Sequence, residues 1–227
     1  LSRRTEAFPR LRALGAQPLL GDLDDRASLA RVAGLADAVL HCAPPPREGT
    51  DDARTAHLLA ALGAGRSLPQ RIVYISATGV YGDCAGAHID ETRALRPSSA
   101  RAVRRVAAER RLREFGARHG VAVSILRAPG IYAAERLPLE RLRRGDPVPQ
   151  GTHDPYTNHI HADDLARMAC LALFRGAPGR VYNAVDLTDL RMGEYFDLAA
   201  RVFGLPPPPL ANPDKLAERL SPIALSF

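Results

Sequence analysis

Short apolar runs alternate with longer segments of helical periodicity along most of the chain. The runs that have the length of buried strands are residues 17–20, 38–40, 71–76, 121–126 and 181–184. The segments whose apolar positions recur at helical spacing are residues 6–14, 24–33, 50–62, 98–115 and 192–203, with a short basic helix within residues 136–149. This alternation predicts an α/β fold built on a parallel sheet.

The longest predicted helix begins after Ser98 or Ser99, either of which is suited to cap it. Its apolar positions are expected to face the sheet. Arg104, Arg110 and Arg111 are expected to remain in water.

Composition narrows the class of protein. The chain has 227 residues, 46% of them hydrophobic, and no run approaches the roughly 18 apolar residues that span a membrane. Its start shows no charged segment followed by a long apolar stretch, so no secretory signal is visible. The three cysteines are widely spaced and form no Cys-x-x-Cys pattern, which suits a reducing compartment. We therefore expect a cytoplasmic protein that has no membrane partner.

The net charge of +6 invites a nucleic-acid interpretation. However, the arginines are scattered through periodic segments and are not gathered beside aromatic side chains. Of the 31 basic residues, only Lys215 is a lysine. We interpret the charge as a solvated surface and expect no nucleic-acid partner.

A hydroxyl-rich turn follows the predicted strand at residues 71–76. It reads Ser76-Ala77-Thr78-Gly79-Val80-Tyr81-Gly82. In an open parallel sheet, ligands bind in the crevice outside the carboxyl ends of the strands. The turn therefore indicates an enzyme that acts on a small molecule.

Five landmarks in the same order resemble the extended, atypical short-chain dehydrogenase/reductase superfamily, which includes the NAD(P)-dependent epimerases and dehydratases. They are Gly21-Asp22-Leu23, His41-Cys42-Ala43-Pro44, the hydroxyl turn, residues 126–132 and residues 160–166. The resemblance runs from the first residue to about residue 205. It implies a Rossmann-like, doubly wound parallel sheet with a small C-terminal substrate-binding lobe. The implied nucleotide domain covers residues 1–130 and 155–190, and the lobe covers 131–154 and 191–227.

The resemblance also implies a cofactor site. Asp22 and Leu23 would contact the adenine, the segment His41, Cys42, Ala43 and Pro44 would line the cofactor, and Ala128, Pro129 and Gly130 would pass the nicotinamide. Arg3 and Arg4 follow the presumed second strand, where an arginine pairs with the 2′-phosphate of NADP and an acid would favour NAD. NADP is therefore preferred and NAD is the second choice. The alternative is that the two arginines merely begin a solvated helix.

Two features depart from the family pattern. The Gly-rich phosphate-binding turn, which opens these proteins, does not occur in the sequence. The chain starts as though its first βα unit were missing, so we expect an incomplete sequence, or alternatively a short chain that has lost this turn.

The second departure is the absence of the catalytic Tyr-x-x-x-Lys motif. Counting back from Glu109 places its two positions at Arg101 and Arg105, and arginine is not a plausible proton donor. Arg105 would bind ribose or stabilise an oxyanion, and Ser76 or Thr78 would polarise the substrate. Tyr81 or Tyr132 would replace the missing acid.

Other polar residues are candidates for substrate contact. Asp90 and Glu91 resemble the acidic loop of the family, and Tyr132 and His161 lie near the start of the presumed lobe. Arg101 and Arg105 share a helical face at i, i+4 spacing and would bind an anion, or alternatively each would face water separately. His153, His159 and His161 lie close in sequence to Asp163 and Asp164, but these acids suit a helix start, so we expect no metal site.

The leading hypothesis is a protein related to NAD(P)-dependent oxidoreductases, epimerases and dehydratases, acting on a small polar substrate such as a nucleotide sugar. The alternative is a non-catalytic NADP-binding redox sensor or scaffold, because both residues of the catalytic motif are absent and a fold does not fix a function. The resemblance also admits a homodimer.

Overall fold

The computed structural model describes residues 1–212 and 214–216. They form two compact units. The first unit contains residues Leu1–Ser76, Ala100–Leu126 and Ala169–Tyr182, and the second contains Ala77–Ser99, Arg127–Met168 and the described residues from Asn183 onward. Residues 213 and 217–227 of the predicted lobe lie outside the described residues.

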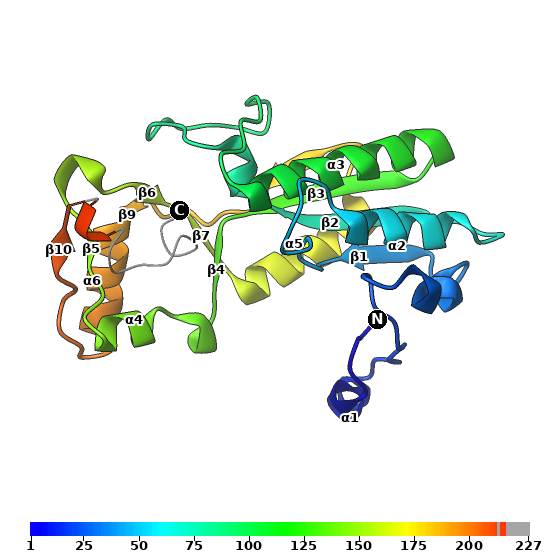
Figure 1. Cartoon of the computed structure of the whole chain (residues 1–227), viewed down its shortest axis with the longest axis horizontal. Coiled ribbons are helices and arrows are strands. Elements are labelled where there is room, and N and C mark those ends of the chain that lie inside the picture. The colour runs from blue at the N-terminus through cyan, green and yellow to red at the C-terminus, as the bar shows by residue number, and fades with distance from the viewer. Residues whose placement is uncertain (213, 217–227) are drawn as a thin grey trace. The chain divides into compact units, whose positions relative to one another are not determined.

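A four-stranded sheet organises the first unit (Figure 1). Its strands are β1 (Ala38–His41), β2 (Arg71–Ala77), β3 (Ala122–Ala128) and β8 (Val181–Asn183), in the spatial order β1-β2-β3-β8. β1 and β2 pair in parallel, with Ala38 opposite Arg71. The predicted α/β fold with a parallel central sheet is confirmed.

Helices α2 (Ala53–Gly63) and α3 (Ala100–His119) lie side by side over one face of this sheet (Figure 1). The core between them is made of alternate strand residues and apolar helix positions: Leu58, Leu59, Leu62, Ile72, Tyr74, Ala108, Leu112, Phe115, Val123 and Ile125. Ser124 occupies the other face of β3, where the chain leaving α5 (Ala162–Arg175) packs closely. A Cβ atom on Gly176 would lie 2.5 Å from the Ser124 Oγ.

The N-terminal part of the first unit is less regular than predicted. Residues 6–14 form the 3-10 turn η1 (Thr5–Ala7) and the short helix α1 (Phe8–Ala13). The strand predicted at residues 17–20 is only a parallel bridge between Ser2 and Leu20, and the helix predicted at residues 24–33 is the 3-10 helix η2 (Arg26–Val32). A bridge of one residue pair is too short to form a strand. η2 begins after Asp25, whose side chain accepts a hydrogen bond from the Ala27 amide.

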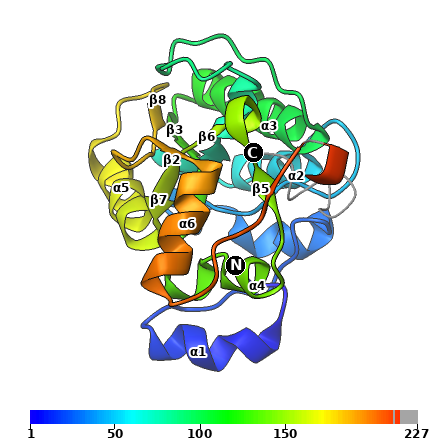
Figure 2. The ribbon, with the colours of Figure 1, turned by 90° about the vertical axis from the view of Figure 1, so that its left-hand side faces the viewer.

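The second unit consists of short paired strands and helices. β4 (Gly130–Tyr132) pairs in parallel with β7 (His159–His161), β6 (Tyr156–Thr157) pairs antiparallel with β9 (Leu190–Arg191), and β5 (Val148–Pro149) pairs in parallel with β10 (Leu210–Ala211). Short 3-10 helices η3 (Thr78–Tyr81), η4 (Ala134–Arg136) and η5 (Gly151–His153) connect these elements. α6 (Met192–Val202) packs against α4 (Leu139–Arg143) and β5 (Figure 2), and Leu142, Val148 and Phe196 form the centre of that core.

One arginine departs clearly from expectation. Arg104 was expected to remain in water, but it is only 5% exposed and donates from Nη1 to the Gly49 carbonyl oxygen at 2.7 Å. The prediction for Arg104 is wrong because the chain before α2 folds over this face of α3.

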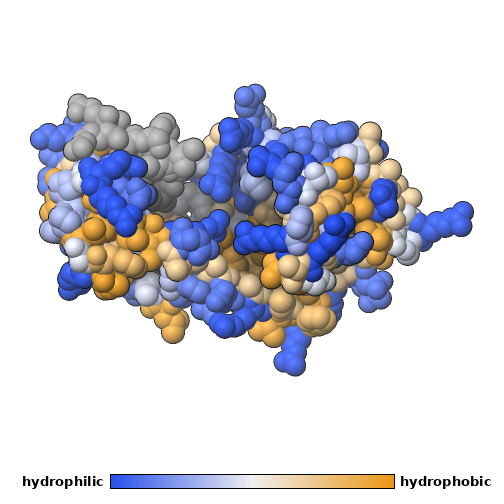
Figure 3. Space-filling view, turned by 90° about the horizontal axis from the view of Figure 1, so that it is seen from below, coloured by the Kyte–Doolittle hydropathy of each residue, from blue (hydrophilic) through white to orange (hydrophobic). Residues whose placement is uncertain are grey.

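On the face of the molecule shown in Figure 3, hydrophilic and hydrophobic residues are interspersed. Among the described residues, no helix is both long and apolar enough to cross a membrane.

The N-cap of α2 provides a stability test. Asp52 is fully buried, and its carboxylate accepts hydrogen bonds from the Thr55 amide at 3.0 Å and the Thr55 hydroxyl at 2.9 Å. We expect Asp52→Ala to lower the free energy of unfolding by about 1–3 kcal/mol, because both donors lose a buried acceptor. Urea unfolding measures the change. Asp25→Ala, which removes the exposed cap of η2, is the control and should cost less. Equal losses would contradict this account.

Candidate functional site

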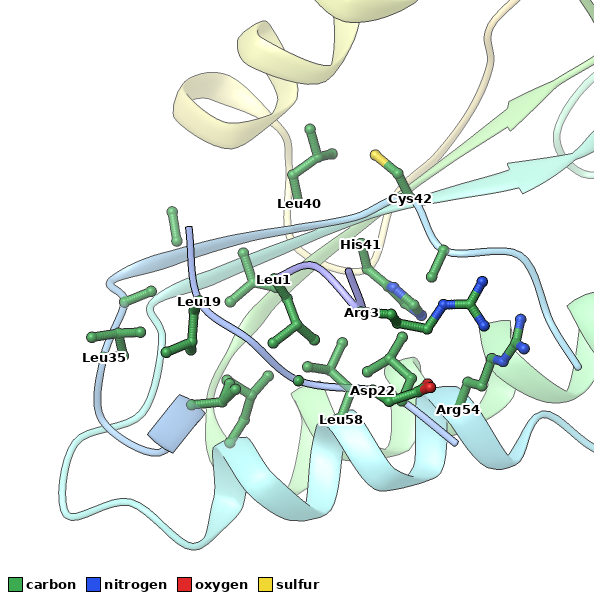
Figure 4. A pocket seen from close by; sticks show the side chains of 18 of the residues that line it. Leu1, Arg3, Leu19, Asp22, Leu35, Leu40, His41, Cys42, Arg54 and Leu58 are labelled. Atoms are coloured by element: carbon green, nitrogen blue, oxygen red, sulfur yellow. The ribbon is translucent and has the colours of Figure 1, made fainter. Parts of the chain in front are cut away.

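A cavity of about 650 Å³ lies in the first unit, along β1 (Figure 4). We call it the β1 cavity. It is bounded by β1, by the two short segments around Ser2 and Leu19, and by side chains of α2 and η2. Figure 4 shows leucines at one end and Arg3, Asp22 and Arg54 at the other. The β1 cavity thus has an apolar end and a polar end.

The β1 cavity brings together most of the residues predicted to bind a cofactor. Those that line it are Arg3, Asp22, Leu23, His41, Cys42, Ala43 and Pro44. Arg4 is exposed and is not among the lining residues. Ala128 is buried at the end of β3, and Gly130 begins β4 in the second unit.

Arg54 holds the polar end of the cavity in place. Its guanidinium forms a two-point ion pair with Asp24, with Nη2 at 2.6 Å and Nε at 2.7 Å from the carboxylate oxygens, and it also donates to the Pro44 carbonyl at 3.1 Å. The hydrogen bond from Arg54 lowers the pKa of the Asp24 carboxyl. Sequence reasoning missed Arg54, since thirty residues separate it from Asp24 and no motif connects them.

His41 begins a buried chain of hydrogen bonds. Its Nε2 lies 2.9 Å from the Thr55 hydroxyl oxygen, and that hydroxyl donates to Asp52. Since the Thr55 proton is used by Asp52, Nε2 must be the donor to Thr55. Burial lowers the pKa of His41 to about 4; the nearby Asp52 opposes this shift and Arg105 adds to it. His41 is therefore neutral at physiological pH.

The polar groups of β2 bond to α3. The Ser76 hydroxyl donates to Glu109 Oε1 at 2.6 Å, and both residues are buried. Arg105 donates from Nη1 to the Tyr74 hydroxyl at 3.0 Å and to the Ile75 carbonyl, while its buried Nε has no hydrogen-bond partner among the residues that the structure describes. Arg101 is exposed. The two guanidinium groups predicted to share one helical face therefore lie in different surroundings.

Tyr81 lies within a buried network of the second unit. Its hydroxyl donates to Asn183 Oδ1 at 2.7 Å and accepts from Arg127 Nη1 at 2.9 Å, and the Arg127 guanidinium lies over the Tyr81 ring at 4.8 Å. Glu91 Oε1 accepts a hydrogen bond from the backbone amide of Asn183 at 2.7 Å. Sequence reasoning missed Asn183 and the role of Arg127, because these contacts join positions far apart in the chain.

The remaining predicted residues of the second unit divide into two groups. Thr78 begins η3 and is half-buried, and Asp90 is exposed and accepts hydrogen bonds from Thr92. Tyr132 and His161 belong to an aromatic cluster in which their ring centroids are 5.2 Å apart.

The same aromatic cluster contains two residues that were not predicted as site residues. His159 stacks on Tyr195 with ring centroids 4.0 Å apart, and burial lowers the pKa of His159. Within the described residues, no three His, Cys, Asp or Glu side chains are grouped so as to hold a metal ion.

Comparison with known proteins gives a family match. A model of the NAD dependent epimerase/dehydratase family matches residues 1–184. Protein YeeZ of Escherichia coli (strain K12) is 29% identical over 182 residues, which are 78% of this chain and 63% of YeeZ. The chain therefore spans less than two thirds of the length of this curated relative.

Solved structures share the fold. A functionally unknown conserved protein from Silicibacter pomeroyi DSS is 30% identical, with a TM-score of 0.75, and the match covers 100% of this chain and 76% of that one. MoeE5, solved in complex with UDP-glucose and NAD, is 24% identical, with a TM-score of 0.69 and coverage of 92% and 81%. At that identity, the MoeE5 match shows a common fold.

The buried imidazole of His41 predicts a pH dependence. Because the pKa of His41 is depressed in the folded protein, the unfolded chain binds its proton more readily, and stability falls as the pH drops from 6.5 towards 4. We expect His41→Gln to flatten this decline, which at most amounts to about 3.5 kcal/mol for a shift from 6.5 to about 4 at 1.4 kcal/mol per pKa unit. Urea unfolding across this interval tests the expectation, with His88→Gln, an exposed site, as the control. Identical slopes for wild type and His41→Gln would refute it.

Proposed function

The chain belongs to the NAD-dependent epimerase/dehydratase family, and we propose that it binds a nicotinamide dinucleotide and uses it on a small polar substrate. One observation carries the proposal. Seven residues that the sequence assigned to the cofactor line a single cavity along β1, and the polar end of this cavity lies towards the carboxyl end of that strand. Ligands of open α/β sheets bind at this end of the strands.

The donor set at the polar end fits the nucleotide half of such a cofactor. Asp22 offers carboxylate acceptors to an adenine amine or a ribose hydroxyl, and Arg3 offers a guanidinium to a phosphate. We assign NADP as the cofactor because Arg3 would pair with the 2′-phosphate. NAD is the alternative, and the Gly-rich turn that would hold the pyrophosphate does not occur within residues 1–227.

The substrate class is also part of the proposal. A nucleotide sugar is supported by the structure of MoeE5, which was solved in complex with UDP-glucose and NAD. When bound, the dinucleotide would supply the hydride chemistry, and the protein would supply position and proton handling. We place Asp90, Glu91, Arg101, Tyr132 and His161 on the substrate side.

Among the proposed catalytic residues, Thr78 is the favoured hydroxyl. It is half-buried at the start of η3 and would hold the substrate oxygen. Ser76 and Tyr81 already donate their hydroxyl protons to Glu109 and Asn183, so either would have to exchange its partner in order to act on substrate. Arg105 would act by positioning the end of β2.

A non-catalytic NADP-binding sensor or scaffold is the second candidate. The observation that favours it is that two of the hydroxyls considered for catalysis, those of Ser76 and Tyr81, are satisfied within the protein. Cofactor binding without turnover would identify this function.

Calorimetric titration with NADPH and NADH tests the cofactor assignment. We expect NADPH to bind more tightly, and Arg3→Gln to weaken NADPH binding about tenfold while leaving NADH binding unchanged, since one charge-assisted contact is worth about 1.5–3 kcal/mol. Arg4→Gln is the matched control, because Arg4 does not line the cavity. Absence of heat with both dinucleotides would exclude the cofactor proposal.

Turnover tests the catalytic assignment. We expect Thr78→Val to lower the rate of NADPH consumption or sugar conversion by about 100-fold, as does the loss of one donor to a developing oxyanion. The measurement follows nicotinamide absorbance with UDP-glucose as the first substrate in a screen of nucleotide sugars. Thr188→Val, at an exposed position outside the proposed site, is the control. An undiminished rate in Thr78→Val would remove Thr78 from the mechanism.

A further inference from the structure

Two segments border the polar end of the β1 cavity. One is residues 21–24, whose first three residues line the cavity, and the other is residues 41–46, whose first four line it. The second segment ends in three consecutive prolines at positions 44–46. Because proline has no amide hydrogen, hydrogen bonds to the backbone of these prolines must use their carbonyl oxygens. An arginine side chain, which only donates, suits this requirement.

Arg54 is hydrogen-bonded to both segments. It is the second residue of α2, and Figure 4 shows it beside Asp22. Its Nε and Nη2 donate to the Asp24 carboxylate at 2.7 and 2.6 Å, which attaches the first segment. Its Nη1 donates to the carbonyls of Pro44 and Pro45 at 3.1 and 3.4 Å, which attaches the second. Each guanidinium nitrogen therefore has an acceptor within the protein.

The first segment is attached to α2 at a second point. His57, on the next turn of α2, has its Nδ1 2.8 Å from the Leu23 carbonyl oxygen, and since a carbonyl only accepts, Nδ1 carries the hydrogen. Within the segment, the Asp22 amide donates to the Ser28 hydroxyl oxygen at 2.9 Å, and the Asp24 amide donates to Asp22 Oδ1 at 2.9 Å. The backbone that would contact the adenine is thus held from α2.

Arg54 could act on a dinucleotide directly or through these segments. To contact a phosphate, it would have to release the Asp24 carboxylate, whose two oxygens match its planar group. Arg3 is exposed and lines the same cavity, so it is better placed for that contact. The Arg54 side chain is only 17% exposed, which also suits a contact inside the protein.

We propose that Arg54 is a positioning residue for the dinucleotide, holding the two segments in the arrangement that the cofactor meets at the polar end. This inference rests on the proposed function. Segments that the ligand itself had to order would lower its affinity, whereas segments held in advance do not carry that cost. The Asp24 carboxylate is the necessary partner, because it fixes the guanidinium through two hydrogen bonds.

Calorimetric titration of the full chain with NADPH and NADH tests this role. We expect Arg54→Gln and Asp24→Asn each to raise the Kd of both dinucleotides about tenfold, because each change separates the two segments from one another. The double variant should also lose about tenfold, and not about a hundredfold, since both changes remove the same contact. Retention of the effect with NADH is informative, because NADH has no 2′-phosphate.

The Asp24→Asn variant separates positioning from direct contact by the sign of its effect. If Arg54 served the ligand directly, removal of the Asp24 charge would free the guanidinium and strengthen NADPH binding. If Arg54 positions the segments, the same change weakens the binding of NADPH and NADH alike.

A matched control exists in the same unit. Arg111 also makes a two-point ion pair, with Asp51, and neither residue lines the β1 cavity. We expect Arg111→Gln to bind both dinucleotides with the affinity of the wild type. Circular dichroism confirms that each variant is folded.

Hydrogen exchange provides a measurement that needs no cofactor. The Asp24 amide donates to Asp22 Oδ1, and the Asp25 amide donates to the Asp22 carbonyl at 3.0 Å. We expect both amides to exchange about tenfold faster in Arg54→Gln, because the first segment opens more readily, and to be unchanged in Arg111→Gln.

Four results would overturn the positioning role while the cofactor proposal stands. They are wild-type affinity in Arg54→Gln, loss of NADPH binding alone, tighter NADPH binding in Asp24→Asn, and an equal loss of affinity in Arg111→Gln. Absence of heat with the wild type would reject the proposed cofactor and the positioning role together, so the two failures are distinguished. Unchanged exchange at Asp24 and Asp25 would show that Arg54 does not hold the first segment, and would also reject the role.

Discussion

The buried polar contact between β2 and α3 is the constraint on which the first unit depends. β2 continues to Ala77, beyond Tyr74, which is its last residue paired with β1. Arg105 donates to the Ile75 carbonyl, and Glu109, one helical turn later, accepts from Ser76. Buried polar groups are costly unless they are paired, so these two contacts fix the position of α3 along β2. They also fix the point at which the chain leaves the sheet towards η3.

Arginine side chains also donate to backbone carbonyls elsewhere in both units. Guanidinium groups donate to backbone carbonyls where the chain turns: Arg54 to Pro44, Arg71 to Gly176, Arg104 to Gly49, Arg113 to Gly179 and Arg191 to Asp154. A planar group with five donors suits irregular backbone, which has carbonyls without ladder partners. The arginine-rich composition, interpreted from sequence as a solvated surface, therefore has a structural role at these positions.

Sequence reasoning succeeded where local patterns decide the structure. The apolar run of β2 and the periodicity of α6 predicted those elements to within a residue or two. It failed at the N-terminal segments, because a two-residue bridge and a 3-10 helix depend on neighbours distant in sequence. Seven of the residues predicted to bind the cofactor line the β1 cavity, because strand ends meet at one edge of a sheet. The network of Tyr81, Arg127 and Asn183 was not predicted, since no local pattern connects positions 46 and 102 residues apart.

At alkaline pH the first unit is affected by ionisation of Tyr74, while its arginines keep their charge. Guanidinium groups stay charged there, so the carbonyls that they hold are not released. Burial raises the pKa of the Tyr74 hydroxyl to about 12, and the Arg105 guanidinium beside it opposes that shift. In the unfolded chain this phenol ionises near its ordinary pKa of 10. The free energy of unfolding therefore falls as the pH rises from 10 to 12. The tolerance of the first unit to alkali is thus limited by a phenol in its core, while its cationic surface remains charged.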